Sequence, residues 1–171
     1  MKIKNIKIGT SYPPIVIAEM SGNHNRSLNN ALNIVEQAKL CGVKFLKLQT
    51  YTPDTITLNS NRPDFKIKKN SPWKKFNNLW NLYNEAYMPW KWQKKIFNLS
   101  KKLNLSYFSS PFDESAVDFL EKLGCAAYKI ASAEINHIPL LEKVAKTRKP
   151  VILSIGLARL SDIKLAIKTL R

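Results

Sequence analysis

The chain has 171 residues, of which 44% are hydrophobic and 10% aromatic, and a formal net charge of +16. This composition excludes a disordered segment, and the length allows one domain with a buried core. No uncharged apolar run is long enough to span a membrane, and the N-terminal residues do not have the pattern of a signal peptide. Cys41 and Cys125 do not form a metal-type pair, so reduced thiols in a cytoplasmic protein are expected.

Short apolar runs alternate with amphipathic segments along the chain. The runs predict five strands, over residues 15–21, 44–50, 106–111, 126–132 and 151–156. Periodic apolar residues predict helices over 27–40, 74–86, 90–103, 114–123, 138–147 and 160–170. The irregular stretch 51–73 is too long for a plain connection, and we expect it to form an excursion over one face. The alternation predicts an α/β fold with parallel strands and right-handed crossovers.

Each predicted strand has one fully apolar side and one side that becomes polar toward its C-terminal end. In the fourth strand Tyr128 and Ile130 share the apolar side, while Lys129 lies on the other. This asymmetry favours a (β/α) TIM-barrel type, in which helices cover the outer face and functional residues lie at the strand C-termini. A doubly wound open sheet is the alternative, but it needs apolar residues on both faces, and Lys47 and Lys129 count against it.

If the strands are neighbours, polar side chains gather at one end of the sheet. Two ammonium groups with several hydroxyls suit a small ligand that carries phosphate and carboxylate, and two carboxylates suit proton transfer. Each member also has a structural interpretation: a lysine paired with Glu19, serines that end a strand, or a solvated carboxylate. The gathered residues are Glu19, Lys47, Gln49, Ser110, Lys129, Ser132, Glu134 and Ser154.

The positive charge has two interpretations. It could serve a nucleic-acid site, or it could belong to solvated helix surfaces. The basic residues are spread along the chain, for example over 66–69, 91–95 and 146–149. This spread favours solvated surfaces, so no nucleic-acid partner is expected. His24 and His137 are far apart in sequence and do not indicate a metal pair.

Five stretches, in order along the chain, are similar to one protein family. They are IAEMSGNHNRSL at 17–28, KLQTYTPDTITLNS at 47–60, FSSPFDESAVDFLEKLG at 108–124, YKIASAEINHIPLL at 128–141 and KPVILSIGLA at 149–158. They resemble the N-terminal part of the sialic acid (nonulosonate) synthase family. The stretch 49–68 is most similar to the pseudaminic acid synthase branch of that family.

The resemblance implies a transferase that forms a carbon–carbon bond. Family members are phosphoenolpyruvate-dependent condensing enzymes with a (β/α)8 barrel, usually followed by a small antifreeze-like domain. The enol carbon of phosphoenolpyruvate adds to the open-chain aldehyde of an N-acetylated amino sugar, and water attacks the resulting cation before phosphate leaves. In the pseudaminic acid branch the acceptor is a 2,4-diacetamido-2,4,6-trideoxy-altrose. A divalent metal, Mn²⁺ or Mg²⁺, and a homodimer are implied for the complete enzyme.

The resemblance also assigns roles to residues by motif position. Those implied to bind phosphoenolpyruvate are Lys47, Gln49, Ser110, Lys129, Ser132 and Ser154. Catalytic roles are implied for Glu19, Lys129 and Glu134, and sugar contacts for Asn23, His24 and Glu134. The family's metal-binding histidines are implied to lie beyond this chain, so no metal ligand is expected within it.

About five of the eight βα units of a closed barrel are predicted within residues 1–171. We therefore expect an incomplete barrel, without the C-terminal strands and the antifreeze-like domain, whose first and fifth strands have unpaired edges. The hypothesis is a partial synthase that is inactive alone. Phosphate release by the purified chain with phosphoenolpyruvate, acceptor sugar and Mn²⁺ would overturn it.

Two alternative functions stay open at this point. One is a synthase of N-acetylneuraminate or legionaminate, and the other is a non-catalytic, basic anion-binding remnant. Salt-sensitive binding to an oligonucleotide, without binding to phosphoenolpyruvate, would favour the remnant.

Overall fold

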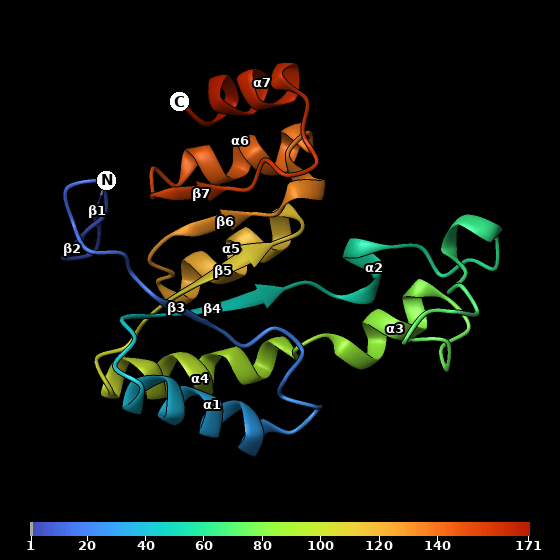
Figure 1. Ribbon diagram of the computed structural model, residues 1–171, viewed down its shortest axis with the longest axis horizontal. Helices are drawn as coiled ribbons and strands as arrows, with labels where there is room; N and C mark the ends of the chain where they lie inside the picture. Colours follow the sequence, from blue (N-terminus) through green and yellow to red (C-terminus); the bar gives the residue numbers. More distant parts are fainter. Residues whose placement is uncertain (1) are drawn as a thin grey trace.

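Five parallel strands form the central sheet of the protein, which the computed structural model describes over residues 2–171 (Figure 1). The sheet order follows the chain order, and each strand pairs in parallel with the next. This order confirms the TIM-barrel type, because a doubly wound sheet reverses its strand order. The strands are β3 (Ile17–Glu19), β4 (Phe45–Thr50), β5 (Ser106–Pro111), β6 (Tyr128–Ile130) and β7 (Val151–Leu153).

Helices follow the strands and cover the outer face of the sheet. Figure 1 shows α1 and α4 side by side below the sheet, and α5, α6 and α7 following one another toward the C-terminal end of the chain. Leu46, Leu48 and Tyr128 point outward into this packing and are fully or almost fully buried. The helices are α1 (Leu28–Leu40), α4 (Trp90–Lys102), α5 (Glu114–Leu123), α6 (Ile138–Lys146) and α7 (Leu160–Leu170). Among residues 2–171, no helix has the length and apolar character needed to cross a bilayer.

The five predicted strands are all present, although most are shorter than their apolar runs. The first run, 15–21, forms only β3, because the chain turns at residues 21–26 directly after the strand. In the described part of the chain, β3 and β7 each have one neighbour, which confirms the predicted unpaired edges.

One predicted helix is wrong at its start. The helix expected over 74–86 is α3 (Leu79–Ala86), and residues 74–77 form turns before it. The Asn78 side chain accepts a hydrogen bond of 2.9 Å from the Asn81 amide and so caps the helix. An N-cap residue has extended backbone angles, which stops the helix from extending further back.

The excursion expected after the second strand is a structured lobe. It contains α2 (Pro53–Ile56), the 3-10 turn η1 (Pro63–Phe65) and α3, and it extends to one side of the sheet in Figure 1. The Trp80 indole donates a 2.8 Å hydrogen bond to Asp54, and the rings of Tyr51 and Tyr83 meet edge to face at 5.9 Å. These contacts join the start of the excursion to its end.

The structure also has a hairpin that the sequence did not predict. Strands β1 (Lys2–Ile3) and β2 (Ile6–Lys7) pair antiparallel, and Ile3 is buried in the core cluster. Two-residue strands are too short to produce a clear periodic signal, so the run KIKNIKI did not indicate them.

The N-cap of α5 gives a first prediction, on stability. The Asp113 carboxylate accepts the Ser115 amide at 3.0 Å. Replacing Asp113 with alanine is expected to lower the free energy of unfolding by about 1 kcal/mol, because one end-of-helix donor loses its acceptor. Urea unfolding followed by circular dichroism measures the change. Asp118→Ala in the same helix is the control, since it removes only an exposed ion pair with Lys143. Equal losses in both variants would contradict the capping role.

Candidate active site

The inner face of the sheet collects the polar residues that the alternation predicted. Lys47 on β4 is in register with Glu19 on β3 and with Phe108 on β5. Lys129 on β6 is in register with Ile152 on β7. Phe45, two residues before Lys47 on the same face, meets Phe108 edge to face at 6.0 Å, so the inner face is apolar on the N-terminal side of the charged groups. The charged groups therefore lie toward the C-terminal end of the strands, above an apolar layer, as the sequence predicted.

Lys47 and Lys129 have different partners on this face. The Lys47 ammonium forms an ion pair with the Glu19 carboxylate, whose side chain is 38% exposed. The Lys129 ammonium donates to the Ser154 hydroxyl and, at 3.1 Å, to the carbonyl of Ile130. Among residues 2–171, Lys129 thus has only neutral hydrogen-bond acceptors, and no ion-pair partner matches its charge.

Burial lowers the pKa of the Lys129 ammonium, and the nearby positive charge of Lys47 lowers it further. The carboxylates of Glu134 and Glu19 act in the opposite direction but do not cancel these effects. Two cations that repel each other across a half-buried space form a site that an anion would stabilise.

Hydroxyl groups lie at the same strand ends as the two cations. Ser110 on β5 is buried on the inner face, in register with Gln49 of β4. Ser132 follows β6, and its hydroxyl accepts the Gly156 amide at 3.0 Å, which joins the loop after β6 to the loop after β7. The structure therefore brings all the residues predicted to bind phosphoenolpyruvate to the same end of the sheet.

Glu134 lies in the 3-10 turn η2 (Ser132–Glu134) directly after β6. Burial raises the pKa of its carboxyl group, an effect that its own backbone amide and the charges of His137 and Lys129 only partly offset. Its Oε2 atom is buried and has no hydrogen-bond partner among residues 2–171. A carboxyl group with a raised pKa keeps its proton to a higher pH than a solvated glutamate, which suits it to donate that proton.

Besides Glu134, the two residues predicted to bind the sugar lie in different environments. Asn23 lines a pocket beside the ends of β3 and β4, where the Ser21 hydroxyl donates to Gln49 at 3.2 Å. His24 is fully buried, and its ring meets Trp92 of α4 edge to face at 5.7 Å. Its Nδ1 atom accepts the Arg26 amide at 3.1 Å. The predicted sugar contact of His24 stays a prediction, whereas its observed contacts hold the 21–26 loop in place.

This loop has strained backbone. Ser21, Asn25 and Arg26 have positive φ angles of 46°, 47° and 55°, which non-glycine residues rarely adopt. The Arg26 guanidinium donates to the Asn84 carbonyl at 2.5 Å and so fixes the loop to α3. Strain of this kind often marks functional sites, where the surrounding structure maintains it. The roles of Ser21 and Arg26 were missed from the sequence, because each depends on partners distant in the chain.

A metal site is not formed by the described residues alone. Among residues 2–171, no three histidine, cysteine, aspartate or glutamate side chains are arranged to hold an ion. Glu19 is paired with Lys47, and His24 is enclosed by protein. The side chains described here therefore do not fit the divalent metal that the resemblance implies.

The inner-face site can be compared with known proteins once its residues are placed. The NeuB family matches residues 34–171, which is most of the chain and includes Lys47, Lys129 and Glu134. The chain belongs to the NeuB family. This result confirms the predicted membership of the sialic acid synthase family.

Individual NeuB relatives agree with this placement. The chain is 46% identical to the pseudaminic acid synthase of Helicobacter pylori, over 93% of the chain and 46% of that protein. It is 32% identical to an N,N'-diacetyllegionaminic acid synthase of Campylobacter jejuni, over 91% of the chain and 46% of that protein. The solved N-acetylneuraminic acid synthetase of Leptospira borgpetersenii, in complex with citrate, matches with a TM-score of 0.81 and 30% identity, over 99% of the chain and 54% of that chain. The chain spans about half the length of the curated relatives it matches.

Proposed function

We propose that this NeuB chain supplies the phosphoenolpyruvate site of a pseudaminic acid synthase. The reaction joins phosphoenolpyruvate to 2,4-diacetamido-2,4,6-trideoxy-altrose and releases phosphate. The observation that carries the proposal is the convergence of Lys47 and Lys129 on one inner face, where burial and then the charge of Lys47 lower the pKa of Lys129. Phosphoenolpyruvate has a phosphate and a carboxylate on adjacent positions, so one molecule can pair with both cations.

The side chains of this site suit each step of the proposed reaction. Lys47 and Lys129, with the hydroxyls around them, hold phosphoenolpyruvate so that its enol carbon faces the acceptor aldehyde. When that carbon bonds to the aldehyde, the aldehyde oxygen needs a proton, which the raised pKa of Glu134 allows its carboxyl group to supply. Water then adds to the cationic carbon and loses a proton, and cleavage of the C–O bond releases phosphate.

The degree of similarity to known synthases supports the proposed acceptor. Identity is 46% to a pseudaminic acid synthase and 32% to a legionaminic acid synthase over nearly the same part of the chain. This difference supports the pseudaminic acid branch over the legionaminate alternative. For the whole enzyme we keep Mn²⁺ or Mg²⁺ as the proposed metal and a homodimer as the proposed assembly.

Titration calorimetry of the 171-residue chain tests the anion site. Phosphoenolpyruvate is expected to bind at least about tenfold more tightly than inorganic phosphate or pyruvate, because each control ligand carries only one of the two anionic groups. The binding should be unchanged in EDTA. Equal affinity for all three ligands would contradict the proposal, and salt-sensitive binding only to an oligonucleotide would support the basic-remnant alternative.

The lowered pKa of Lys129 predicts how this binding depends on pH. As pH rises through that pKa, below its ordinary value of 10.5, the ammonium loses its proton and its attraction for the ligand. Affinity should then fall by about tenfold per pH unit above the pKa, as expected for one linked proton. In Lys129→Arg the guanidinium stays charged over the same pH range, so the affinity for phosphoenolpyruvate should not fall there. Calorimetry across the range measures both curves, and identical curves would exclude Lys129 as the titrating group.

A further inference from the structure

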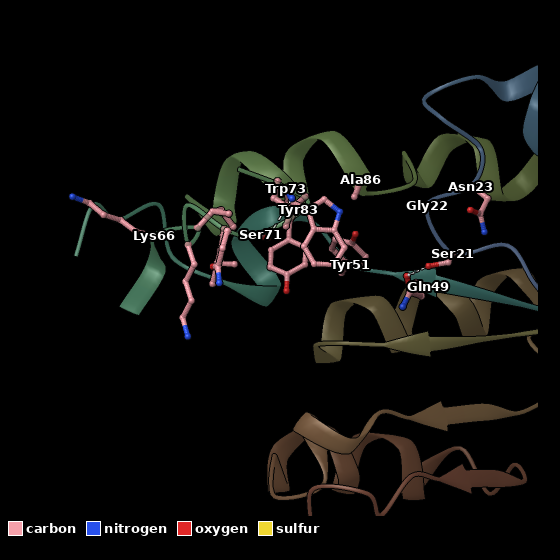
Figure 2. A pocket seen from close by; sticks show the side chains of 15 residues that line it. Ser21, Gly22, Asn23, Gln49, Tyr51, Lys66, Ser71, Trp73, Tyr83 and Ala86 are labelled. Carbon is pink, nitrogen blue, oxygen red and sulfur yellow. Dashed lines mark hydrogen bonds between the residues drawn. The ribbon is translucent and has the colours of Figure 1, made fainter. Parts of the chain in front are cut away.

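A pocket of about 690 Å³ lies beside the anion site, between the 51–86 excursion and the ends of β3 and β4 (Figure 2). Its size is within the range of cavities that hold small ligands. We call it the aromatic pocket and define it by five of the residues that line it. These are Tyr51, Trp73, Leu79, Leu82 and Tyr83.

The walls of the aromatic pocket are predominantly apolar. Figure 2 shows the rings of Tyr51, Trp73 and Tyr83 grouped on one side of the space. Burial and the neighbouring Tyr83 raise the pKa of Tyr51 to about 12, so its phenol is neutral at physiological pH. Trp73 is 55% exposed although it is large and aromatic. Exposed aromatic surface inside a pocket indicates a ligand with apolar groups.

One end of the aromatic pocket opens toward the anion site. Ser21 and Gln49, joined by their 3.2 Å hydrogen bond, line this end. Gln49 lies two residues after Lys47 on the same face of β4. A ligand in the pocket can therefore place its reacting end near phosphoenolpyruvate while its far end lies between the aromatic rings. Ser71, with Asn70 beside it, adds hydrogen-bonding groups at the far end.

Contacts described above hold this pocket in shape. Arg26 fixes α3 to the loop after β3, the Trp80–Asp54 hydrogen bond joins α3 to α2, and Tyr83 packs against Tyr51. A pocket that is formed before the ligand binds loses less entropy on binding.

We infer that the aromatic pocket binds the N-acyl groups of the acceptor sugar, and that Trp73 and Tyr83 determine acceptor specificity. An acetamido group has a methyl that packs on an aromatic ring and an amide that hydrogen-bonds to side chains such as Ser71. A sugar with hydroxyls at the same positions has no methyl group to pack on the aromatic rings, so it loses that apolar contact. This inference rests on the proposed function, because the anion site defines which end of the pocket faces the reaction.

The test uses the 171-residue chain with saturating phosphoenolpyruvate and saturation-transfer NMR. The probes are 2,4-diacetamido-2,4,6-trideoxy-altrose, N-acetylmannosamine and mannose. The acetamido methyl protons should receive the strongest saturation, and mannose should not bind measurably. Trp73→Ala and Tyr83→Ala should each weaken binding of the diacetamido sugar by about tenfold, as expected for lost methyl contacts in an apolar pocket. Trp73→Phe should keep part of the affinity.

Leu58→Ala is the matched control, since Leu58 is 64% exposed in the same excursion and does not line the pocket. Its affinity for the sugar should equal that of the unmodified chain. Failure of the chain to bind phosphoenolpyruvate would contradict the proposed function. If phosphoenolpyruvate binds but the diacetamido sugar does not, the aromatic pocket inference is wrong. It is also wrong if mannose binds as tightly as the diacetamido sugar, or if the Trp73→Ala variant binds that sugar as tightly as the unmodified chain does.

Discussion

Replacing Lys129 with methionine is expected to weaken phosphoenolpyruvate binding by about 100-fold, or about 2.7 kcal/mol. Lys129 is the half-buried cation whose hydrogen-bond partners are the neutral oxygens of Ser154 and Ile130, so a bound anion is the partner that would match its charge. Methionine has a similar length and no charge. Calorimetry at neutral pH measures the loss directly.

The same substitution should not destabilise the fold. The pKa of Lys129 is lowered in the folded chain, which means that its charged form is less favourable there than in the unfolded chain at neutral pH. Removing the charge therefore keeps or raises the melting temperature. Lys146→Met removes an exposed charge from α6 and is the control for the loss of net charge. Equal affinity losses in the two variants would mean that net charge, rather than a specific contact, attracts the ligand.

The Lys47–Glu19 pair predicts two substitutions with opposite effects. Lys47→Met should weaken phosphoenolpyruvate binding by about 30-fold, because a charge-assisted contact to the ligand is lost. Glu19→Gln should strengthen binding by about fivefold, since Lys47 no longer has to leave a partly exposed ion pair worth about 1 kcal/mol. Calorimetry of both variants measures whether the affinity for phosphoenolpyruvate falls in Lys47→Met and rises in Glu19→Gln.

Glu85→Gln is the control for the second substitution. Glu85 pairs with Arg26 at 3.8 Å, away from the inner face, so its loss changes net charge by the same amount without freeing Lys47. A gain in affinity for both glutamine variants would indicate a long-range effect of charge. A loss of affinity in Glu19→Gln would mean that Glu19 contacts the ligand or supports the site in another way.

The sheet and the convergence of Lys47 and Lys129 on its inner face could be predicted from the sequence because both depend on local order. A period of two places Lys47 and Lys129 on one face, and parallel strands place their C-termini at one edge. The aromatic pocket could not be predicted in this way. Trp73 and Tyr83 come from an irregular segment and a short helix, and their position depends on the contacts of Arg26 and Asp54 with distant residues.

The true environment of His24 also depended on tertiary structure. Its motif implied a contact with the sugar, which stays a prediction. The observed packing of its ring against Trp92 depends on the loop after β3, in which Asn25 and Arg26 have positive φ angles. The N-terminal hairpin was missed for the opposite reason, because its strands are too short for any periodic pattern.

The contacts that anchor the excursion affect how acceptor preference can change between chains of this fold. Its internal contacts, from Asp54 to Trp80 and from Tyr51 to Tyr83, join parts of the 51–86 segment to each other, and Arg26 adds a link to the loop after β3. Substitutions at Trp73 can therefore reshape the acceptor side while the strand ends with Lys47 and Lys129 keep their register. The excursion is in this sense a modular unit, and exchanging it between chains of this fold should transfer acceptor choice without altering the anion site.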